Sequence, residues 1–189
     1  MEVEYINIHQ EIVDRCKSGD KIAYKELYDL YSKAMFNICY RITNDRYEAE
    51  DVLQEAFVSA FRNIGAFRAE SSFGAWLKKI VVNRSINHMK KKRLELTPLE
   101  ENMDKAEVNY RDEVLDDPGR LTHNIEMIKK AVNLLPHGYR MVFSLYLLEG
   151  YDHSEIAQIM EISESTSKSQ YNRAKKKLKI ILEELCRTN

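Results

Sequence analysis

The stretch FGAWLKKIVVNRSINHMKKKR, residues 73–93, decides the fold of the first half of the chain. Its apolar residues recur at steps of three and four, which is the spacing of a helix with a buried face. They are Ala75, Trp76, Leu77, Ile80, Val81, Ile86 and Met89. The stretch also holds seven positive charges and no acid: Lys78, Lys79, Arg84, Lys90, Lys91, Lys92 and Arg93. The pattern predicts a helix whose basic face can lie along a phosphate backbone, or an ordinary amphipathic helix with a solvated basic face and a core tryptophan.

The segment before this helix, residues 67–72, is short and polar and is bounded by Phe67 and Phe73. It is predicted to be a loop with an aromatic ring at each edge. Aromatic rings beside a basic surface suit an unstacked nucleic-acid strand, because a base can stack on a ring while cations hold its phosphates. The loop and the helix therefore form a candidate site for such a strand.

The composition of the 189-residue chain indicates an almost wholly helical, all-α protein. Hydrophobic residues make up 44%, enough for one ordinary core or two small ones, and six glycines and three prolines leave few breaks. No apolar run approaches the roughly 20 residues that span a bilayer, and the N-terminus lacks a signal-peptide pattern. We therefore expect a cytoplasmic protein without membrane insertion. Cys16, Cys39 and Cys186 lack ligand spacing, so neither disulfides nor a metal or other cofactor is expected.

The charge varies along the chain, although the net charge is only −1. Residues 1–93 carry 16 basic and 13 acidic residues, whereas residues 94–125 carry three basic and nine acidic ones. The acidic part also contains two prolines and shows no sustained helical stripe. This layout predicts two small helical domains, at residues 1–93 and 125–189, joined by a flexible acidic linker at residues 94–124. The linker is either a plain tether or a polyanion that occupies a nucleic-acid channel.

Local signals divide the first domain into helices. A short helix at residues 11–17 precedes Asp20, which caps a long second helix. Asp45 and Glu48 form an Asp-x-x-Glu variant of the capping box for a third helix at residues 47–64. The acidic outer surface of this third helix consists of Glu48, Glu50, Asp51, Gln54 and Glu55. On the pattern alone, that surface is a solvated helix face.

The second domain contains a helix-turn-helix pattern, DHSEIAQIMEISESTSKSQYNRAKKKL. Asp152 and Glu155 form a capping pair for its first helix, and Ser163 caps the second helix after a short turn. Polar side chains at the front of the second helix can read base edges, while the lysines behind them can bind phosphates. A plain helical hairpin with a basic tail is the alternative. The helix before this pattern, residues 139–149, is expected to bury Met141, Val142, Leu145, Tyr146 and Leu148.

These motifs, in this order, resemble the extracytoplasmic-function (ECF) group of bacterial sigma factors, the smallest members of the sigma-70 family. The resemblance covers roughly residues 10–93 and 123–186. It rests on LYDLYS, EAEDVLQEAFVSAF, FRAESSFGAWLKKIVVNRSINHMKKKR and LLPHGYRMVFSLYLLEGYDHSEIAQIMEISESTSKSQYNRAKKKL. Each motif alone is modest evidence, but their order and spacing together are specific. The family implies a promoter-specificity subunit that binds core RNA polymerase, recognises and melts promoter DNA, serves a restricted regulon and has no catalytic activity.

The resemblance also implies roles for individual residues. The first domain would dock on the largest polymerase subunit through Glu50, Asp51, Gln54 and Glu55. The loop would capture a base flipped from the melted minus-ten element, and the following helix would hold the edge of the duplex. Implied minus-ten contacts are Phe67, Arg68, Ser71, Phe73, Trp76, Lys79, Asn83, Arg84, Lys90, Lys91 and Arg93. Implied minus-thirty-five contacts are Ser165, Thr166, Lys168, Ser169, Gln170, Asn172, Arg173 and Lys176. The linker would thread through the active-site cleft and the RNA exit path.

Three positions depart from the usual pattern of the family. Glu161 stands where a glycine is common in the turn, at a cost of roughly 1 kcal/mol if its φ is positive. Ser167 replaces Val or Ile, which is expected to weaken packing of the recognition helix. Gln170 replaces a frequent arginine, so the upstream element recognised is expected to differ.

Two other classes of protein fit parts of the sequence. A free-standing helix-turn-helix transcription regulator fits the last third of the chain, but residues 1–93 show no strand pattern for a sensing domain. A nucleic-acid enzyme is disfavoured, because the five histidines are scattered and no phosphate loop or second carboxylate cluster is present. Family members are often held inactive by an anti-sigma factor, so such a partner is expected beside core polymerase and promoter DNA.

Overall fold

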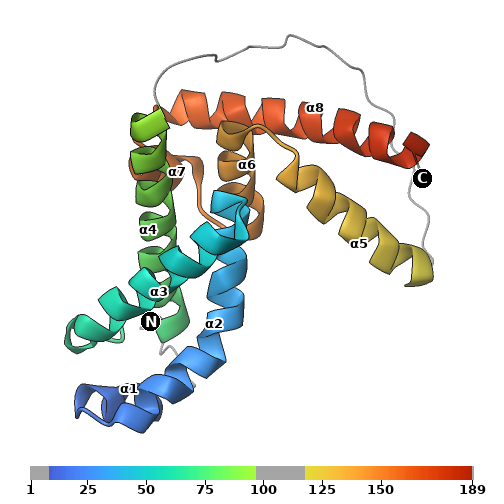
Figure 1. Cartoon of the computed structure of the whole chain (residues 1–189). Coiled ribbons are helices and arrows are strands. Elements are labelled where there is room, and N and C mark those ends of the chain that lie inside the picture. The colour runs from blue at the N-terminus through green and yellow to red at the C-terminus, as the bar shows by residue number, and fades with distance from the viewer. Residues whose placement is uncertain (1–8, 97–117, 189) are drawn as a thin grey trace, which may run out of the picture. The chain divides into compact units, whose positions relative to one another are not determined.

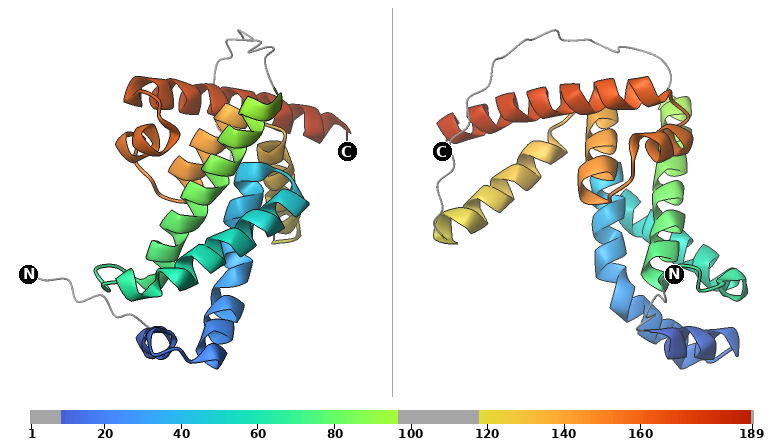
Figure 2. Two further views of the ribbon diagram at one scale, coloured as in Figure 1. Left: turned by 60° about the vertical axis from the view of Figure 1, so that its left-hand side comes forward. Right: turned by 180° about the vertical axis from the view of Figure 1, so that it is seen from behind.

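The computed structural model describes residues 9–96 and 118–188, and every regular element within them is helical (Figures 1 and 2). The all-α prediction is therefore confirmed. The chain divides into two compact units, Met1–Thr97 and Pro98–Asn189. Most of the predicted linker, residues 97–117, lies outside the described residues. Among the described helices, none is long and apolar enough to cross a membrane.

Within residues 9–96, the described part of the first unit, there are four α-helices and a short 3-10 helix. They are α1 Gln10–Lys17, α2 Lys21–Thr43, α3 Arg46–Arg62, η1 Ile64–Ala66 and α4 Phe73–Leu96. Helices α2, α3 and α4 cross one another, and each packs against the other two (Figure 1). Helix α1 packs against α2 and η1. Helix α4 continues three residues beyond the predicted domain boundary at residue 93.

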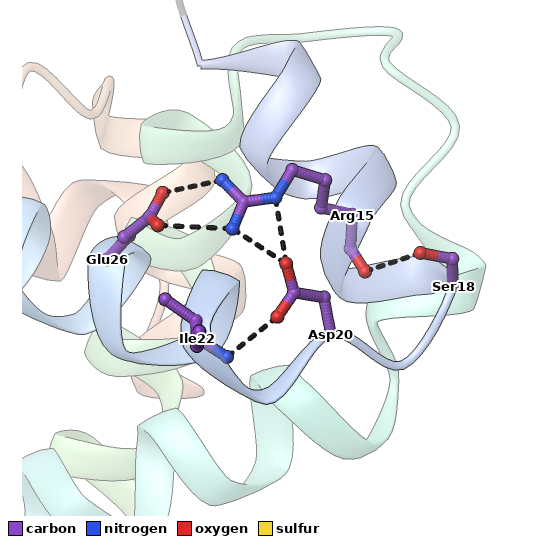
Figure 3. Close-up of polar contacts among 5 residues, drawn as sticks. All are labelled: Arg15, Ser18, Asp20, Ile22 and Glu26. Atoms are coloured by element: carbon purple, nitrogen blue, oxygen red, sulfur yellow. Dashed lines mark hydrogen bonds and ion pairs between the residues drawn. The ribbon is translucent and has the colours of Figure 1, made fainter.

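A polar network holds the corner between α1 and α2 (Figure 3). Gly19 has a φ of +89°, which suits the tight turn, and the Asp20 carboxylate accepts a hydrogen bond from the Ile22 N–H at 2.8 Å. The Arg15 guanidinium donates to Asp20 at 2.6 Å and to Glu26 at 2.9 Å. The bonds from Arg15 and then from the Ile22 amide hold the pKa of the Asp20 carboxyl below its usual range. The predicted cap of the long helix is therefore confirmed.

The core of the first unit lies where α2, α3 and α4 meet. The residues that α4 buries there are Phe73, Leu77, Val81, Val82, Ser85 and Ile86. Four members of the predicted buried stripe are only half-buried: Ala75, Trp76, Ile80 and Met89. The structure corrects the prediction because α4 packs against two helices at once. Its two neighbours, rather than the apolar spacing alone, set which side is buried.

Asp45 caps α3 as predicted, but the predicted capping box is incomplete. The Asp45 carboxylate accepts a hydrogen bond from the Glu48 N–H at 3.0 Å. The Glu48 carboxylate instead pairs with Lys92 of α4 and lies 3.4 Å from Nε2 of His88. A charged donor forms a stronger hydrogen bond with a carboxylate than a backbone amide does. Glu48 therefore joins the start of α3 to the later part of α4 instead of closing its own helix end.

The three cysteines are free thiols. Cys16 and Cys39 are buried, and burial raises the pKa of each thiol to about 11. Both thiols are therefore protonated near neutral pH. Because the thiolate is the reactive form, these two side chains are poor nucleophiles. Cys16 and Cys39 are packing residues, whereas Cys186 is exposed.

The second unit is built around one long helix. Its elements are α5 Pro118–Asn133, α6 His137–Phe143, the π-helix η2 Ser144–Leu148, α7 His153–Met160 and α8 Glu164–Thr188. Helix α8 packs against α5, α6 and α7 (Figure 1). Helix α5 begins at Pro118, inside the stretch that was predicted to be linker as far as residue 124. Proline suits the first helical position because its φ is already close to the helical value. An N–H group at this position would have no acceptor within the helix, so its absence costs no hydrogen bond.

A buried cluster joins α5, α6 and α8. Its members are Ala131, Val132, Leu135, Phe143, Ala174 and Ile181. Arg140 is also buried, and its Nη1 donates to the Leu135 carbonyl at 3.0 Å, just past the end of α5. Tyr146 and Leu148 were predicted to be buried, yet they are 37% and 49% exposed. The prediction fails because the chain widens into a π-helix here, which rotates the side chains away from the α-helical register.

The helix-turn-helix is confirmed by its caps. Asp152 and Glu155 form a complete capping box, with hydrogen bonds of 2.8 and 2.9 Å. Helix α7 ends at Met160, and its C-cap residue Glu161 has a φ of +58° in the left-handed region, as the family glycine at this turn suggests. The Ser163 hydroxyl accepts a hydrogen bond from the Thr166 N–H at 3.0 Å and so caps α8 as predicted.

Replacing Glu161 with glycine is expected to stabilise the second unit. The left-handed conformation is costly for a residue with a Cβ, and the greater chain entropy of unfolded glycine offsets part of the gain. We expect Glu161→Gly to raise the free energy of unfolding of this unit by about 0.5 kcal/mol. Hydrogen exchange of the α7 and α8 amides in the full chain measures this free energy of unfolding. The control, Gln158→Gly inside α7, is expected to lower it by about 1 kcal/mol. Equal losses in both variants would show that Glu161 is unstrained.

Candidate nucleic-acid and protein interfaces

The residues predicted to dock on a protein partner lie together on α3. Asp51, Gln54 and Glu55 are exposed, and half-buried Glu50 accepts a hydrogen bond from Nε of Arg46 at 3.0 Å. Residues spaced by three and four share one side of a helix, so these four form one acidic surface, here called the α3 face. Within the described ranges, no group of three or more His, Cys, Asp or Glu side chains could hold a metal ion.

Two exposed apolar side chains extend the α3 face and were missed by the sequence analysis. Tyr47 is 79% exposed and Val58 is 48% exposed. Tyr47 lies one turn before Asp51, and Val58 lies one turn after Gln54. Exposed apolar groups beside polar ones are typical of interaction surfaces. Their four-residue spacing from Asp51 and Gln54 of the α3 face was the signal that could have identified them.

A solvent-open hollow of about 380 Å³ lies between α2 and α3, beside the α3 face. Its lining residues are Tyr28, Ser32, Lys33, Phe36, Arg46, Glu50, Leu53 and Gln54. Two of the predicted docking residues, Glu50 and Gln54, therefore stand at its wall. Phe36 and Leu53 supply apolar surface, while Lys33 and Arg46 supply positive charge. The hollow gives the α3 face a concave edge of apolar and charged side chains, and α2 forms the other side of this edge.

The loop at residues 67–72 is anchored by the two aromatic residues that were expected to receive a base. Phe67 is 3% exposed and Phe73 is 0% exposed. Their rings pack edge to face with centroids 5.6 Å apart, and the Trp76 ring lies 5.5 Å from Phe67 and 5.6 Å from Phe73. The structure corrects the expectation of open stacking platforms, because burial removes the faces of Phe67 and Phe73 from solvent. Trp76 is half-buried and keeps part of its ring accessible.

Between these anchors the loop is open to solvent. Arg68, Ala69 and Glu70 are exposed, and Ser71 is half-buried. Ala69 has a φ of +58°, a left-handed conformation that alanine seldom adopts and that no sequence pattern indicates here. Arg68 and Ser71 are therefore the predicted loop contacts that a ligand can reach.

The outer face of α4 carries most of the predicted phosphate contacts. Its exposed members are Lys79, Asn83, Arg84 and Lys91. Asn83 was an implied minus-ten contact, and its exposure shows that it is not a core residue. Lys90 is half-buried, and the side chain of Arg93 lies outside the described residues. These positions give α4 a mainly basic exposed surface, here called the α4 face.

The front of α8 presents a polar stripe to solvent. The exposed members of the predicted set are Ser165, Lys168, Ser169, Asn172, Arg173 and Lys176, and Thr166 is half-buried. Steps of three and four place most of them on one side, here called the α8 face. Lys168 forms an ion pair with Glu164 at 2.6 Å, one turn earlier. Hydroxyl, amide and guanidinium groups on this side match the donors and acceptors of DNA base edges.

Gln170 does not belong to the α8 face. Its side chain is half-buried against α6, where a methyl group added at Gly138 would lie 3.6 Å from its Oε1. That oxygen is buried and has no hydrogen-bond partner within the described part of the chain. The structure corrects the prediction of a base contact, because the helix turn points Gln170 toward its own domain.

Ser167, the polar residue at a usually apolar position, has a partner on α7. It is fully buried, and a hydrogen bond of 2.9 Å joins its Oγ to Nδ1 of His153. The His153 ring stacks on Tyr146 at 4.4 Å and meets the edge of Tyr171 at 5.8 Å. Ser167 was expected to weaken the packing of α8, but the hydrogen bond satisfies its hydroxyl. The two helices of the motif are thus joined by a polar contact inside an aromatic cluster.

Comparison with known families covers both units. The model of Sigma-70 region 2 matches residues 27–95, and the model of Sigma-70 region 4 matches residues 125–178. The first match contains the α3 face, the loop and the α4 face. The second contains the helix-turn-helix and the α8 face. Both the order and the spacing of these surfaces therefore follow a known family.

Two sequence relatives extend the likeness to nearly the whole chain. The RNA polymerase sigma-H factor of Pseudomonas aeruginosa is 32% identical over 184 residues, covering 94% of this chain and 95% of that protein. The ECF RNA polymerase sigma-E factor of Haemophilus influenzae is 31% identical over 173 residues, covering 88% and 90%. Such identity over nearly full length shows common family membership.

Two solved structures share the fold. One is the sigma factor RpoE from Bartonella quintana in complex with the anti-sigma factor NepR, with a TM-score of 0.54 and 24% identity over 85% of this chain and 96% of that one. The other is CnrH in complex with the cytosolic domain of CnrY, with a TM-score of 0.53 and 20% identity over 93% and 97%. These two structures show the fold, while the family models and the sequence relatives show the family. The chain belongs to the ECF group of the sigma-70 family, whose members are non-enzymatic initiation factors that give bacterial RNA polymerase its promoter specificity.

Proposed function

We propose that this sigma factor divides promoter recognition among three surfaces. The α3 face docks on core RNA polymerase, the loop and the α4 face hold the melted minus-ten element, and the α8 face reads the minus-thirty-five element. The observation that carries the proposal is the α3 face, where apolar and acidic side chains stand together on one exposed helix side. The protein would work in the cytoplasm, where its sigma factor relatives act on RNA polymerase.

The α3 face has the composition of a protein-binding surface. Its acidic centre offers carboxylates to basic groups of a partner, while Tyr47 and Val58 can bury apolar area at either end. Glu50 is already paired with Arg46, so Asp51 and Glu55 are the more available charges. We therefore assign the main electrostatic contact with core polymerase to Asp51 and Glu55.

The loop and the α4 face suit an unpaired strand beside a duplex end. Lys79 and Arg84 can hold phosphates, and Arg68 and Ser71 can contact a flipped base from the loop. Flipping a base costs a few kcal/mol of stacking, so the shape of the receiving loop would select which promoter opens. In this proposal Phe67 and Phe73 form the base of the loop, and half-buried Trp76 is the ring nearest to the DNA.

Reversing the two available charges of the α3 face is expected to weaken polymerase binding. We expect Asp51→Arg with Glu55→Arg to weaken binding of the full chain to core polymerase at least about tenfold, because like charges would meet at the interface. Fluorescence anisotropy with core enzyme from the same bacterium measures this change.

A matched double reversal on exposed residues elsewhere, Glu11→Arg with Asp29→Arg, controls for net charge. It is expected to leave the affinity within about twofold of the wild type. Equal losses in both variants would contradict the role of the α3 face. Specific duplex binding by the free protein, with no affinity for core polymerase, would instead support a free-standing transcription regulator.

Two substitutions on the α8 face are expected to have different effects. If Arg173 reads a base edge, Arg173→Ala costs about 1–3 kcal/mol on the best promoter and relaxes preference at one base pair. If Lys176 contacts phosphate, Lys176→Ala weakens all sequences alike and lowers the salt dependence. Binding of holoenzyme to promoters randomised upstream, at several salt concentrations, separates the two. Identical effects would contradict direct reading by Arg173.

We also propose that an anti-sigma factor regulates this protein through its exposed apolar side chains. Leu147 and Leu148 of η2 are 55% and 49% exposed, and an inhibitory partner would bury them. Affinity purification of the full chain from non-induced cells is expected to recover a protein that blocks transcription with core enzyme. Leu147→Glu with Leu148→Glu should lose it, whereas Leu30→Glu on the first unit should keep it. Failure to recover any inhibitory protein under all growth conditions would contradict the proposal.

A further inference from the structure

Lys17, at the end of the N-terminal helix α1, contacts the start of the loop at residues 67–72. Lys17 is the last residue of α1, and its Nζ donates a hydrogen bond to the backbone carbonyl of Phe67 at 2.9 Å. The same ammonium lies 5.6 Å from the centroid of the Phe67 ring. One residue of α1 therefore contacts both the peptide group and the ring at which the chain leaves η1 and enters the loop.

The far end of the loop is held independently. Ser72 caps α4, because its hydroxyl accepts a hydrogen bond from the Ala75 N–H at 3.2 Å. The Phe73 ring lies 5.4 Å from the ring of Tyr31 on α2. Tyr31 is in turn joined to Nδ1 of His9 by a hydrogen bond of 2.8 Å. Lys17 precedes Phe67 by 50 residues and Tyr31 precedes Phe73 by 42, so each end of the loop is held by a residue distant in the chain.

With both ends of the loop anchored, the orientation of its first peptide group determines the path of the chain between them. Burial of Phe67 fixes the position of its ring, but a ring can stay buried while the following peptide plane rotates. The hydrogen bond from Lys17 fixes that plane, because it holds the carbonyl oxygen. Arg68, Ala69 and Glu70 are exposed, so packing contributes little to the path that follows. The path of the loop therefore depends on the orientation of the Phe67 carbonyl.

We propose that Lys17 is a positioning residue for promoter opening. By holding the Phe67 carbonyl, it sets the path of residues 68–72 and so the shape that receives the flipped base. This inference rests on the proposed function of the loop and extends the recognition machinery to α1, outside the region matched by the Sigma-70 region 2 model. Lys17 would act through the loop and need not touch DNA itself.

The alternative for Lys17 is a solvated surface charge. A surface charge would contribute to general attraction of DNA, which any exposed lysine nearby would supply equally. Lys21 at the start of α2 provides the matched comparison, because it is exposed and its removal changes the net charge by the same amount. Lys17→Met and Lys21→Met therefore separate positioning from charge.

The experiment is transcription from a promoter library randomised across both promoter elements, using the full chain and core polymerase. For the wild type, sequencing of the transcripts is expected to give base preferences in the minus-ten and minus-thirty-five elements. Lys17→Met is expected to reduce discrimination at one minus-ten position by about tenfold, the effect of losing one charge-assisted hydrogen bond. Preferences in the minus-thirty-five element and affinity for core polymerase should not change. Lys17→Arg, which keeps a donor, should restore most of the discrimination.

The outcomes separate this inference from the function on which it rests. Unchanged minus-ten preference in Lys17→Met, or an equal change in Lys21→Met, would overturn the positioning role while leaving the loop as the base-binding site. Parallel loss of preference in both elements would indicate general destabilisation and also overturn it. A wild-type protein that binds core polymerase but shows no minus-ten preference would contradict the proposed function of the loop itself.

Discussion

Burial of Phe73 at the start of α4 is the constraint on which the first unit most depends. Its side chain is completely buried and meets the rings of Tyr31, Phe67 and Trp76. These contacts fix the first turn of α4 against α2 and bring the end of η1 to the same place. The loop is therefore a short segment tied at both ends to one aromatic cluster. Neither the loop nor the start of α4 can shift without disturbing a packed core.

The helices could be predicted because the chain marks their ends with local signals. Asp20, Asp45 and the Asp152–Glu155 pair cap the helices that follow them, and each cap acts over two or three residues. Contacts between distant residues left no such signal. Glu48 fits a capping box by spacing, but its carboxylate pairs with Lys92, a residue 44 positions later. Periodicity also cannot show that α4 has two neighbours, which is why Trp76 was placed too deep.

The accuracy of the predicted interfaces depended on whether one helix or several elements form the surface. Exposure of Asp51, Gln54 and Glu55 follows from the buried stripe on the opposite side of the same helix, so sequence spacing was enough. Phe67 and Gln170 were implied DNA contacts, but tertiary contacts leave Phe67 buried and Gln170 half-buried. Leu148 is exposed because it lies in a π-helix, and no local sequence pattern predicts that helix. Surfaces made by one helix were thus predictable, whereas those shaped by a neighbouring element were not.

The contact between Ser167 and His153 also has an evolutionary consequence. Either side chain alone would leave a polar atom without its partner inside the joint between α7 and α8, which is costly. A return to an apolar residue at position 167 would also require replacement of His153. Either both positions would change together, or the first change would give a less stable intermediate. The pair therefore restricts mutational paths back to the apolar joint that is usual in the family.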